Sequence, residues 1–475
     1  MVGKTTAIAL LGLTGSALAQ STFKVDSPDS IAESAKTLAS DLIALYHGDE
    51  PGRTVGLLDG PPTEGGGDYY WWQSGMYWAT LLEYRRVTGD QQYDKLAIDA
   101  LVAQSGIEFG PKNAAYMPVN QTATLGNDEQ CMWGLAALHA AETDLPAHDK
   151  DDVPTWLGLA ENVLKSQLMR WDNEIEDEKK AKEPTCGGGL RWQIPPSNAG
   201  YNYKNSWSNG CYFDLAARLG ALTGNQTYTD AATTAFEWMQ SVGLIDKETW
   251  RVYDGGHTEQ NCSDINKIEF SANAAVLISG AAHMYNSTGS ATWKNRLDGL
   301  LAHTLKNFFP DGVAVERACE TGPTCTTDMF AFKGILHREL SLVPALAPYT
   351  RDALAPVLRS SAEAAVKQCT GGDSKRQCGF YWSDGEFVKP DTTGVGETMS
   401  VLSAVQGLLA LEMEGKAAVG GGGNGNGSAA GGSGAAGGGA GGAAGKTGDP
   451  NGAAQKGVKG MVWMVMAGAV GAMVM

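Results

Sequence analysis

Two adjacent carboxylates stand at the start of a long apolar stretch of this chain. The segment reads Gly126-Asn127-Asp128-Glu129-Gln130-Cys131-Met132-Trp133 and begins a helix expected over residues 128–142. One interpretation is structural, with Asn127 as the helix cap, Gln130 completing a capping box and the acidic residues complementing the helix dipole. The other is chemical, because glycoside hydrolysis needs one carboxyl group as nucleophile or base and a second as proton donor.

The chemical interpretation assigns the two carboxyl groups different roles. Adjacent side chains diverge, so we expect carboxyl groups about 5–6 Å apart, nearer to the geometry of retaining than of inverting glycosidases. Backbone N–H groups and the helix dipole are expected to keep Asp128 ionised as the nucleophile. Glu129 needs a raised pKa to act as the acid, which predicts apolar or acidic neighbours around it.

The elements that position this pair are two alternating kinds of helix. Amphipathic helices are predicted over residues 30–47, 91–104, 154–171, 227–241, 291–309 and 349–367. Helices that are apolar or small on nearly all sides are predicted over residues 69–87, 128–142, 206–222, 270–285, 328–343 and 397–411. A helix buried on most sides has the second pattern, and a surface helix has the first. Strict alternation predicts an all-α fold, an (α/α)6 toroid of six inner and six outer helices within residues 20–416.

The connections between these helices predict where the site lies. Short links follow the inner helices and contain Gly89, Gly224 or Gly289, residues typical of helix ends. Long links precede most inner helices, and long loops in compact domains are usually functional. They would gather around the N-terminal ends of the inner helices, so we expect the site on that face.

Aromatic and polar residues in these loops and helix starts are candidate substrate-binding residues, because flat aromatic faces pack on sugar rings. The candidates expected near Asp128 are Trp72, Asn205, Trp207, Tyr253, Asp254 and Lys333. Core packing is the alternative role for any single aromatic residue, and a core salt bridge is the alternative for Lys333.

Several motifs taken together resemble glycoside hydrolase family 76, the α-1,6-mannanase family, in a fungal member with a glycosylphosphatidylinositol (GPI) anchor. They are Tyr70-Trp71-Trp72-Gln73-Ser74-Gly75, residues 126–130, Cys186-Gly187-Gly188-Gly189-Leu190-Arg191-Trp192, Lys204-Asn205-Ser206, Asn209-Gly210 and Phe332-Lys333-Gly334. The resemblance implies the same toroid and retaining catalysis. It also implies that Asp128 matches the first of two adjacent catalytic aspartates, and that Glu129 replaces the second, the acid/base.

The resemblance further implies action on mannan or on the mannose of GPI glycans, with β-glucan of the wall as an acceptor. The competing hypothesis is a catalytically silent mannan-binding or cell-wall scaffold protein, and substitution of Glu129 separates the two. The seven histidines show no metal-ligand spacing, and neither a Walker loop nor a G-x-S-x-G motif occurs, so no metal or cofactor is expected. A net charge of −17 makes nucleic acid a poor partner.

Both ends of the chain have the composition of targeting segments. Residues 1–19 are predicted to be a secretory signal peptide rather than a buried first helix. Residues 417–450 are rich in Gly, Ala and Ser and predict a flexible linker. Residues 451–475 combine small residues, a polar spacer and an apolar tail, which predicts a GPI signal with attachment at Asn451 rather than a short tail anchor. The protein is therefore expected on the outer face of the plasma membrane or in the wall.

Eight cysteines in an exported chain favour disulfides. Spacing predicts the pairs Cys319–Cys325 and Cys369–Cys378, and leaves the pairing of Cys131, Cys186, Cys211 and Cys262 open. Glycosylation sequons stand at Asn120, Asn225, Asn286 and Asn426, with a weaker one at Asn261.

Overall fold

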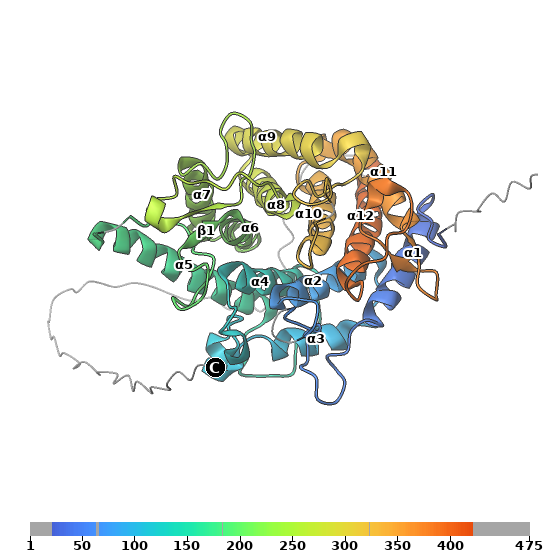
Figure 1. The fold of residues 1–475 in the computed structure, drawn as a ribbon, viewed down its shortest axis with the longest axis horizontal. Helices are drawn as coiled ribbons and strands as arrows, with labels where there is room; N and C mark the ends of the chain where they lie inside the picture. The colour runs from blue at the N-terminus through green and yellow to red at the C-terminus, as the bar shows by residue number, and fades with distance from the viewer. Residues whose placement is uncertain (1–20, 63–65, 183, 323, 421–475) are drawn as a thin grey trace, which may run out of the picture. The chain divides into compact units, whose positions relative to one another are not determined.

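Twelve α-helices alternate between an inner and an outer ring in the computed structural model, which describes residues 21–62, 66–182, 184–322 and 324–420 (Figure 1). The inner helices are α2 (Trp71–Thr88), α4 (Asn127–Glu142), α6 (Ser206–Thr223), α8 (Ser271–Thr288), α10 (Phe332–Leu346) and α12 (Val395–Gly420). The outer helices are α1 (Pro28–Ile43), α3 (Asp94–Ala103), α5 (Trp156–Lys180), α7 (Gln226–Ser241), α9 (Ala291–Phe308) and α11 (Arg351–Lys367). Each inner helix packs against the next, and α12 closes the ring on α2. The predicted (α/α)6 toroid is confirmed.

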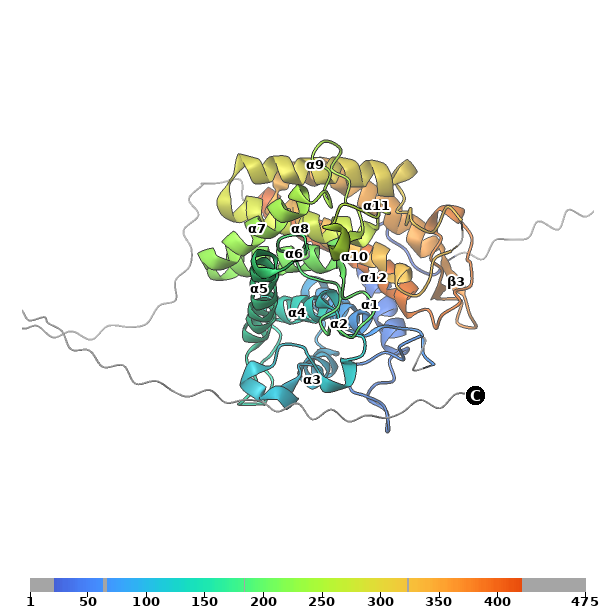
Figure 2. The same ribbon diagram turned by 60° about the vertical axis from the view of Figure 1, so that its left-hand side comes forward.

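Burial differs between the two rings as the sequence pattern predicts. In α4 every residue from Asn127 to Ala140 is buried, whereas the outer helix α9 buries one stripe, which includes Trp293, Leu297 and Leu301. Helix α9 packs over α8, on the outside of the ring (Figure 2). An inner helix therefore has almost no solvent face, and a polar side chain on it needs either a partner or a cavity.

Three inner helices end at glycines in the left-handed conformation. Gly89, Gly224 and Gly289 have φ values of 75°, 69° and 63°. The N–H of each glycine donates to the carbonyl oxygen four residues earlier, on Arg85, Gly220 and Tyr285 respectively. A non-glycine residue is strained in this conformation, so these glycines end the helix and start the short link to the outer ring.

The longer connections contain two small antiparallel sheets. Strand β1 (Tyr203–Asn205) pairs with β2 (Gly255–His257), with Lys204 opposite Gly256. Strand β3 (Cys369–Gly371) pairs with β4 (Gln377–Cys378). The first sheet ties the loop before α6 to the loop before α8 and so orders the face of the ring at the start of these helices.

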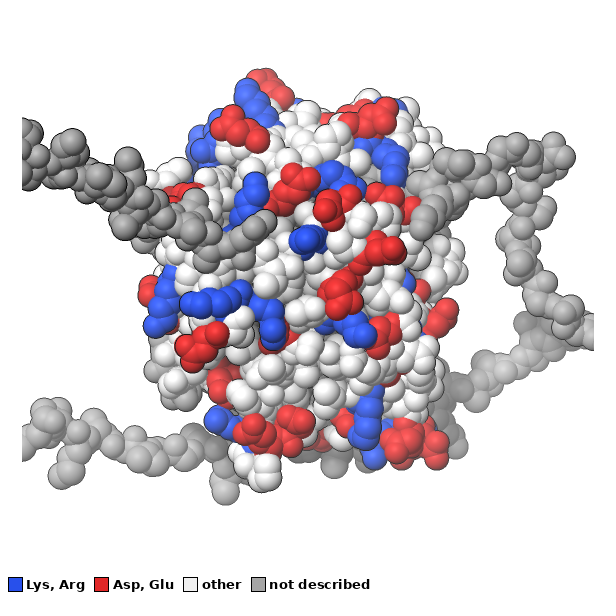
Figure 3. All heavy atoms as spheres, turned by 90° about the vertical axis from the view of Figure 1, so that its right-hand side faces the viewer, with Lys and Arg blue, Asp and Glu red and all other residues white. Residues whose placement is uncertain are grey.

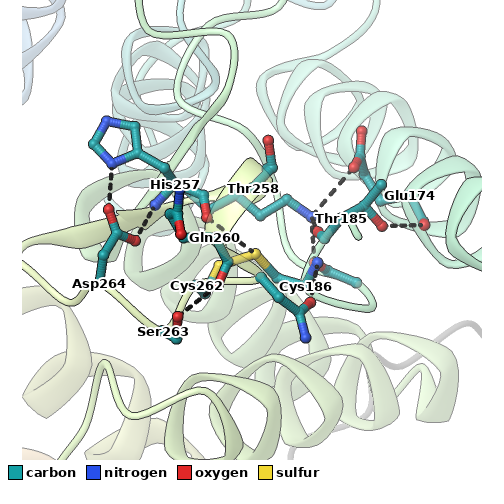
Figure 4. The surroundings of a disulfide bond; sticks show 12 residues. Glu174, Thr185, Cys186, His257, Thr258, Gln260, Cys262, Ser263 and Asp264 are labelled. Atoms are coloured by element: carbon teal, nitrogen blue, oxygen red, sulfur yellow. Dashed lines mark hydrogen bonds and ion pairs between the residues drawn. A yellow bond between two sulfur atoms is a disulfide. The ribbon is translucent and has the colours of Figure 1, made fainter. Parts of the chain in front are cut away.

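Disulfides tie the same loops together. Cys186 and Cys262 are bonded across 76 residues of sequence, beside the hydrogen-bonded pair His257 and Asp264 (Figure 4). The bonds Cys319–Cys325 and Cys369–Cys378 are the two pairs expected from spacing, with Cα atoms 4.8 and 3.8 Å apart. Cys131 and Cys211 are buried free thiols.

The predicted targeting segments lie outside the described residues. This applies to the signal peptide, to Asn426, to Asn451 and to the apolar tail. Helix α12 continues to Gly420, past the expected start of the linker at residue 417. No helix in the described part of the chain is long and apolar enough to cross a membrane. The sequon residues Asn120, Asn225, Asn286 and Asn261 are exposed. On the side of the molecule drawn in Figure 3, acidic and basic residues are interspersed rather than gathered by sign.

Candidate active site

A cavity of about 480 Å³ lies at the N-terminal ends of five inner helices, the face where the long connections were expected to gather. Helix starts contribute Tyr70, Trp72, Asp128, Glu129, Asn205, Trp207, Phe270, Asn273, Asp328, Met329 and Phe332. Loops contribute Ala123, Thr124, Trp192, Gln193, Asn198, Ala199 and Asp254. Four lining residues carry a carboxyl group, and among the described lining residues none is lysine or arginine.

The start of α4 is anchored sideways to its neighbours. Asn127 donates from Nδ2 to the carbonyl of Arg191 (2.8 Å) and accepts at Oδ1 from Arg170 (2.8 Å) on α5. Gln130 donates to the carbonyl of Ala115 (2.8 Å) and also accepts from Arg170. Gly126 is the N-cap, without a side-chain cap bond. The capping interpretation of Asn127 and Gln130 is therefore wrong, because both side chains fix α4 against loops and α5 instead.

Asp128 lines the cavity although only 4% of its surface is exposed. Its Oδ1 accepts the Glu129 backbone N–H (2.8 Å), and its Oδ2 accepts Nδ2 of Asn205 (3.4 Å). Burial nevertheless raises the pKa of Asp128 to about 7, against these two donors. The helix start was expected to keep Asp128 ionised, but desolvation outweighs the backbone and amide donors, so Asp128 ionises only near neutral pH.

Glu129 has fewer hydrogen-bond donors around its carboxyl group than Asp128 has. Burial raises its pKa well above the ordinary value, and the carboxyl groups of Asp128 and Asp328 raise it further. Its Oε2 is buried and has no hydrogen-bond partner among the described residues. The acidic surroundings agree with the expectation for a proton donor, because the neighbouring carboxyl groups favour the protonated form of Glu129.

Asp328 is the carboxylate that the sequence interpretation missed. It directly precedes a short 3-10 helix, Met329–Ala331, that leads into α10, and its Oδ1 accepts Nε1 of Trp72 (3.3 Å). Burial raises the pKa of Asp328 to about 6. A signal was present, since this aspartate opens an inner helix as Asp128 does. Asn273 of α8 was also missed. It lines the cavity, and its buried Nδ2 has no partner among the described atoms.

Aromatic rings form one wall of the cavity. Trp72 packs edge-on against Trp207 with ring centroids 5.8 Å apart, and Phe332 packs against both at 6.1 and 6.0 Å. Phe270 adds an edge contact to Phe332 at 5.6 Å. Trp192 lines the cavity with 39% of its surface exposed. An apolar wall beside a few polar groups is the composition of a site for sugar rings.

Four of the six predicted binding residues line this cavity, namely Trp72, Asn205, Trp207 and Asp254. Asp254 accepts from the Tyr203 hydroxyl (2.7 Å) and from Asn266 (3.1 Å), and burial raises its pKa.

Tyr253 and Lys333 do not line it. Tyr253 is buried in the loop, because consecutive extended residues point to opposite sides and Asp254 takes the cavity side. Lys333 is fully buried, bonded to Glu320 (2.9 Å) and to the Phe380 carbonyl (2.5 Å), with its ammonium over the Phe380 ring. The core salt bridge is therefore its role. In the described part of the chain no cluster of His, Cys, Asp or Glu is arranged to hold a metal.

Comparison with known proteins places this cavity in context. The sequence profile of glycosyl hydrolase family 76 matches residues 30–419. Mannan endo-1,6-alpha-mannosidase DFG5 of Saccharomyces cerevisiae is 38% identical over 389 residues, which cover 81% of this chain and 79% of that protein. Mannan endo-1,6-alpha-mannosidase DCW1 of Candida glabrata is 38% identical over 389 residues, covering 82% and 81%.

Solved structures share the toroid. Dfg5 from Chaetomium thermophilum in complex with glucosamine has a TM-score of 0.76 and 50% sequence identity, covering 82% of this chain and 92% of that one. An inactive variant of the α-1,6-mannanase GH76A of Salegentibacter sp. HEL1_6, in complex with α-1,6-mannotriose, has a TM-score of 0.60 at 18% identity, covering 80% and 99%. At that identity the second similarity shows the fold alone.

Proposed function

Because this chain belongs to glycosyl hydrolase family 76, and is a glycoside hydrolase of the mannan endo-1,6-alpha-mannosidase type, we propose that Asp128 and Glu129 cleave α-1,6-mannosyl linkages by a retaining mechanism. One observation carries the assignment of the pair. Asp128 and Glu129 both line the cavity at the start of a buried helix, where Asp128 accepts two hydrogen bonds and the Oε2 of Glu129 accepts none from the described residues. Donors favour the ionised form that a nucleophile needs, and acidic neighbours favour the protonated form that an acid needs.

In the first step, the ionised Asp128 attacks the anomeric carbon of a mannose ring seated against the aromatic wall. The protonated Glu129 gives its proton to the glycosidic oxygen as the bond to the leaving sugar breaks. Asn205 and the Glu129 backbone N–H hold the Asp128 carboxylate in place. Asn273 offers an unpartnered amide donor to a hydroxyl group of the substrate.

In the second step, the mannosyl ester on Asp128 is released. Glu129, now ionised, takes a proton from the incoming hydroxyl group, whose oxygen attacks the anomeric carbon with retention of configuration. Water gives hydrolysis, and a sugar hydroxyl gives transfer. We therefore propose transfer of GPI-linked mannoproteins to wall β-glucan as the finer activity.

The charge of the cavity supports a GPI glycan as donor. Its four carboxyl groups, on Asp128, Glu129, Asp254 and Asp328, face no lysine or arginine among the described lining residues. A GPI glycan combines α-mannose with an amino sugar that is positively charged when unacetylated, and carboxylates attract such a group. The Dfg5 relative was crystallised with glucosamine, an amino sugar of this kind. This substrate requires the cell surface, which is where the predicted signal peptide and the GPI anchor at Asn451 would hold the enzyme.

The test is hydrolysis of an α-1,6-mannotetraose by four variants of the secreted chain. Asp128→Asn is expected to lower kcat/KM by about 10⁴-fold or more, because it removes the nucleophile. Glu129→Gln is expected to lower it about 10²- to 10⁴-fold, the usual contribution of general acid catalysis. Glu129→Asp, which restores two adjacent aspartates, should retain or raise activity. Asp384→Asn is the control, because Asp384 is exposed and does not line the cavity.

The products distinguish the mechanisms and the functions. Retention predicts that NMR detects the α-anomer first, and an initial β-anomer would contradict the nucleophilic role of Asp128. If Glu129→Asp abolishes turnover and Glu129→Gln does not, the acid is another lining carboxyl, Asp254 or Asp328. If the native chain binds the oligosaccharide with no turnover, and Asp128→Asn binds equally well, the protein is a silent mannan-binding protein. Transfer is tested with a GPI-glycan donor and a β-1,3-glucan oligomer, using mass spectrometry to detect the conjugate.

A further inference from the structure

A second cavity, of about 930 Å³, lies on the outer wall of the toroid, between helix α9 and the loop over residues 243–270. Its lining is Thr249, Trp250, Arg251, Asn295, Asp298, Gly299, Ala302, His303, Lys306, Asn307 and Arg317. It shares no lining residue with the active-site cavity. Nothing in the proposed catalytic mechanism uses these side chains.

Hydrogen bonds within the loop fix the position of Trp250. Trp250 has a φ of 61°, in the left-handed region that a bulky residue rarely adopts. A tight turn imposes this conformation, with the Trp250 N–H donating to the Asp246 carbonyl (2.9 Å) and the Asp246 side chain accepting from the Thr249 N–H (2.8 Å). The indole lies directly on Gly299 of α9, where an added Cβ would stand 2.3 Å from the ring.

The same arrangement occurs in the active-site cavity. The ring of Trp192 lies against Gly200, where an added Cβ would stand 2.2 Å from it, and 39% of the surface of Trp192 is exposed. Anchoring the loop is the alternative role of Trp250, but that role explains neither the cavity beside the ring nor the charges around it.

The cavity collects positive charge on a chain whose net charge is −17. Lys306 and Arg317 are exposed, and Lys306 has no ion-pair partner among the described residues. The Arg251 side chain is 51% exposed and lies 3.7 Å from Glu269, which also bonds His303 (2.6 Å). The one lining carboxylate, Asp298, is compensated by Lys294 (2.7 Å). Three cations thus face this space against little free negative charge, which favours an anionic ligand.

We propose that this cavity is a second, non-catalytic carbohydrate site for a sugar that carries an anionic group. Trp250 supplies the apolar face for the ring, Asn295 and Asn307 supply amide groups for hydroxyls, and Arg251, Lys306 and Arg317 bind the phosphate or carboxylate. The same loop brings Asp254 to the active-site cavity, so an anionic polysaccharide held here stays close to the catalytic face. The site thereby retains charged wall polymer on the enzyme.

Binding of mannose 6-phosphate to the secreted chain, measured by isothermal titration calorimetry, tests this proposal. Saturable binding is expected, and Trp250→Ala, Lys306→Ala and Arg251→Ala should each weaken it about fivefold or more, since each removes one of few direct contacts. Lys165→Ala is the matched control, because it removes the same charge from an exposed position on another outer helix, α5. In the Asp128→Asn chain, which is expected not to turn it over, excess α-1,6-mannotriose fills the active site and should leave this binding unchanged.

Glucuronic acid and mannose 6-phosphate compared side by side assign the anionic group to a carboxylate or a phosphate. The proposal is overturned if mannose or inorganic phosphate alone binds as tightly as mannose 6-phosphate, or if mannotriose displaces the ligand. It is also overturned if Lys306→Ala and Arg251→Ala bind like the native chain. These two exposed positions keep the test valid if Trp250→Ala fails to fold. Hydrolysis of mannotriose by Lys306→Ala should equal that of the native chain.

Discussion

Desolvation determines which carboxyl group in the catalytic cavity holds a proton. The pKa of Asp328 is raised to about 6 and that of Asp128 to about 7, and the pKa of Glu129 is raised well above its ordinary value. Asp128 and Glu129 are buried and Asp328 is half-buried, each with few donors, so each ionisation makes the next one harder. The carboxyl groups of Asp128 and Asp328 beside Glu129 favour its protonated form, which suits an acid next to a nucleophile.

The Asn205 contact predicts a shift in the pH profile. The Asn205 amide donates to Asp128 and lowers its pKa, so Asn205→Ser should raise that pKa and move the acidic limb of kcat/KM, near pH 7, upward by a few tenths of a unit. Serine retains an N-cap acceptor for the Ser208 N–H of α6, which Asn205 now supplies at 3.1 Å. Initial rates from pH 5 to 9 measure the limb.

Asn273→Ser is the control for this shift. Asn273 lines the same cavity but makes no bond to Asp128 among the described contacts, so its loss should change kcat/KM without moving the limb. An unmoved limb in Asn205→Ser would mean that a group other than Asp128 titrates there.

At the level of single residues, sequence reasoning was accurate where the position in a helix determines the environment. The positions of Asp128, Trp72 and Trp207 could be predicted because the first turns of the inner helices lie at the catalytic cavity. Lys333 could not, since it lies in the first turn of α10 beside the cavity-lining Phe332, yet its side chain points to Glu320 in the core. Tyr253 and Asp254 depended on which side of a loop each faces, and the pairing of β1 with β2, unseen in the sequence, decides that.

Helix α4 is held by its neighbours, and this makes its first turn rigid. Arg170 of α5 binds Asn127 and Gln130 together, and the Asn127 N–H donates to the Trp192 carbonyl (2.8 Å). These contacts join α4 to α5 and to the loop before β1. The catalytic pair therefore stands on a braced helix end, as precise positioning of reacting groups requires.

Gly126 leaves room for this geometry, and its replacement should disturb catalysis. Its φ of −99° suits any residue, but a Cβ would stand 2.2 Å from Oδ1 of Asp128 and 3.2 Å from the Trp192 carbonyl oxygen. We expect Gly126→Ala to displace the Asp128 carboxylate and lower kcat about 10²-fold, since a shift of about 1 Å has that effect. The thermal unfolding temperature of Gly126→Ala should stay close to that of the native chain, although its kcat falls.

Gly322→Ala is the matched control, because a Cβ there meets no atom within 4 Å. Its rate should equal that of the native chain. A Gly126→Ala enzyme with native kcat would show that Asp128 does not act from this position.

The alternation of buried and amphipathic helices was predictable because inner and outer environments impose different compositions. The ends of the helices were less predictable from the sequence. Helix α5 runs to Lys180, beyond the predicted residue 171, and past that residue the buried Glu174 pairs with Arg191 (2.7 Å) and Lys204 (3.2 Å) of the connection that follows. The pairing of Cys186 with Cys262 needed the fold, since it joins two loops distant in sequence.

Across the whole toroid, the two ends of the inner ring have opposite electrostatic character. At the N-terminal ends of the inner helices, the carboxyl groups of the catalytic cavity face no lysine or arginine among the described lining residues, and their pKa values are raised. At the C-terminal ends of the inner helices, Glu83 pairs with Arg86 (2.7 Å) and His139 (3.2 Å), and these partners lower its pKa to about 2 despite complete burial. Glu142 pairs with Arg218 between α4 and α6, and its pKa is also lowered. Buried ion pairs therefore link neighbouring inner helices at the end of the ring opposite the catalytic cavity.

This contrast predicts how the stability of the molecule depends on pH. Asp128 has a pKa of about 7 in the folded chain, above its unfolded value, so its contribution to stability is complete below about pH 4 and is lost as the pH rises through 7. Glu83, with a folded pKa of about 2, contributes fully above its unfolded pKa and loses its contribution only in acid. Between pH 5 and pH 8, the ionisation of Asp128 therefore changes the free energy of unfolding, whereas that of Glu83 does not. We expect Asp128→Asn to remove about 2–3 kcal/mol of the native chain's fall in stability over that window.

Glu83→Gln should instead lower stability equally at both pH values, because it breaks a buried pair without titrating there. Urea denaturation of the disulfide-intact chain at the two pH values measures both effects, and an Asp128→Asn profile parallel to the native one would show that Asp128 is already ionised at pH 5.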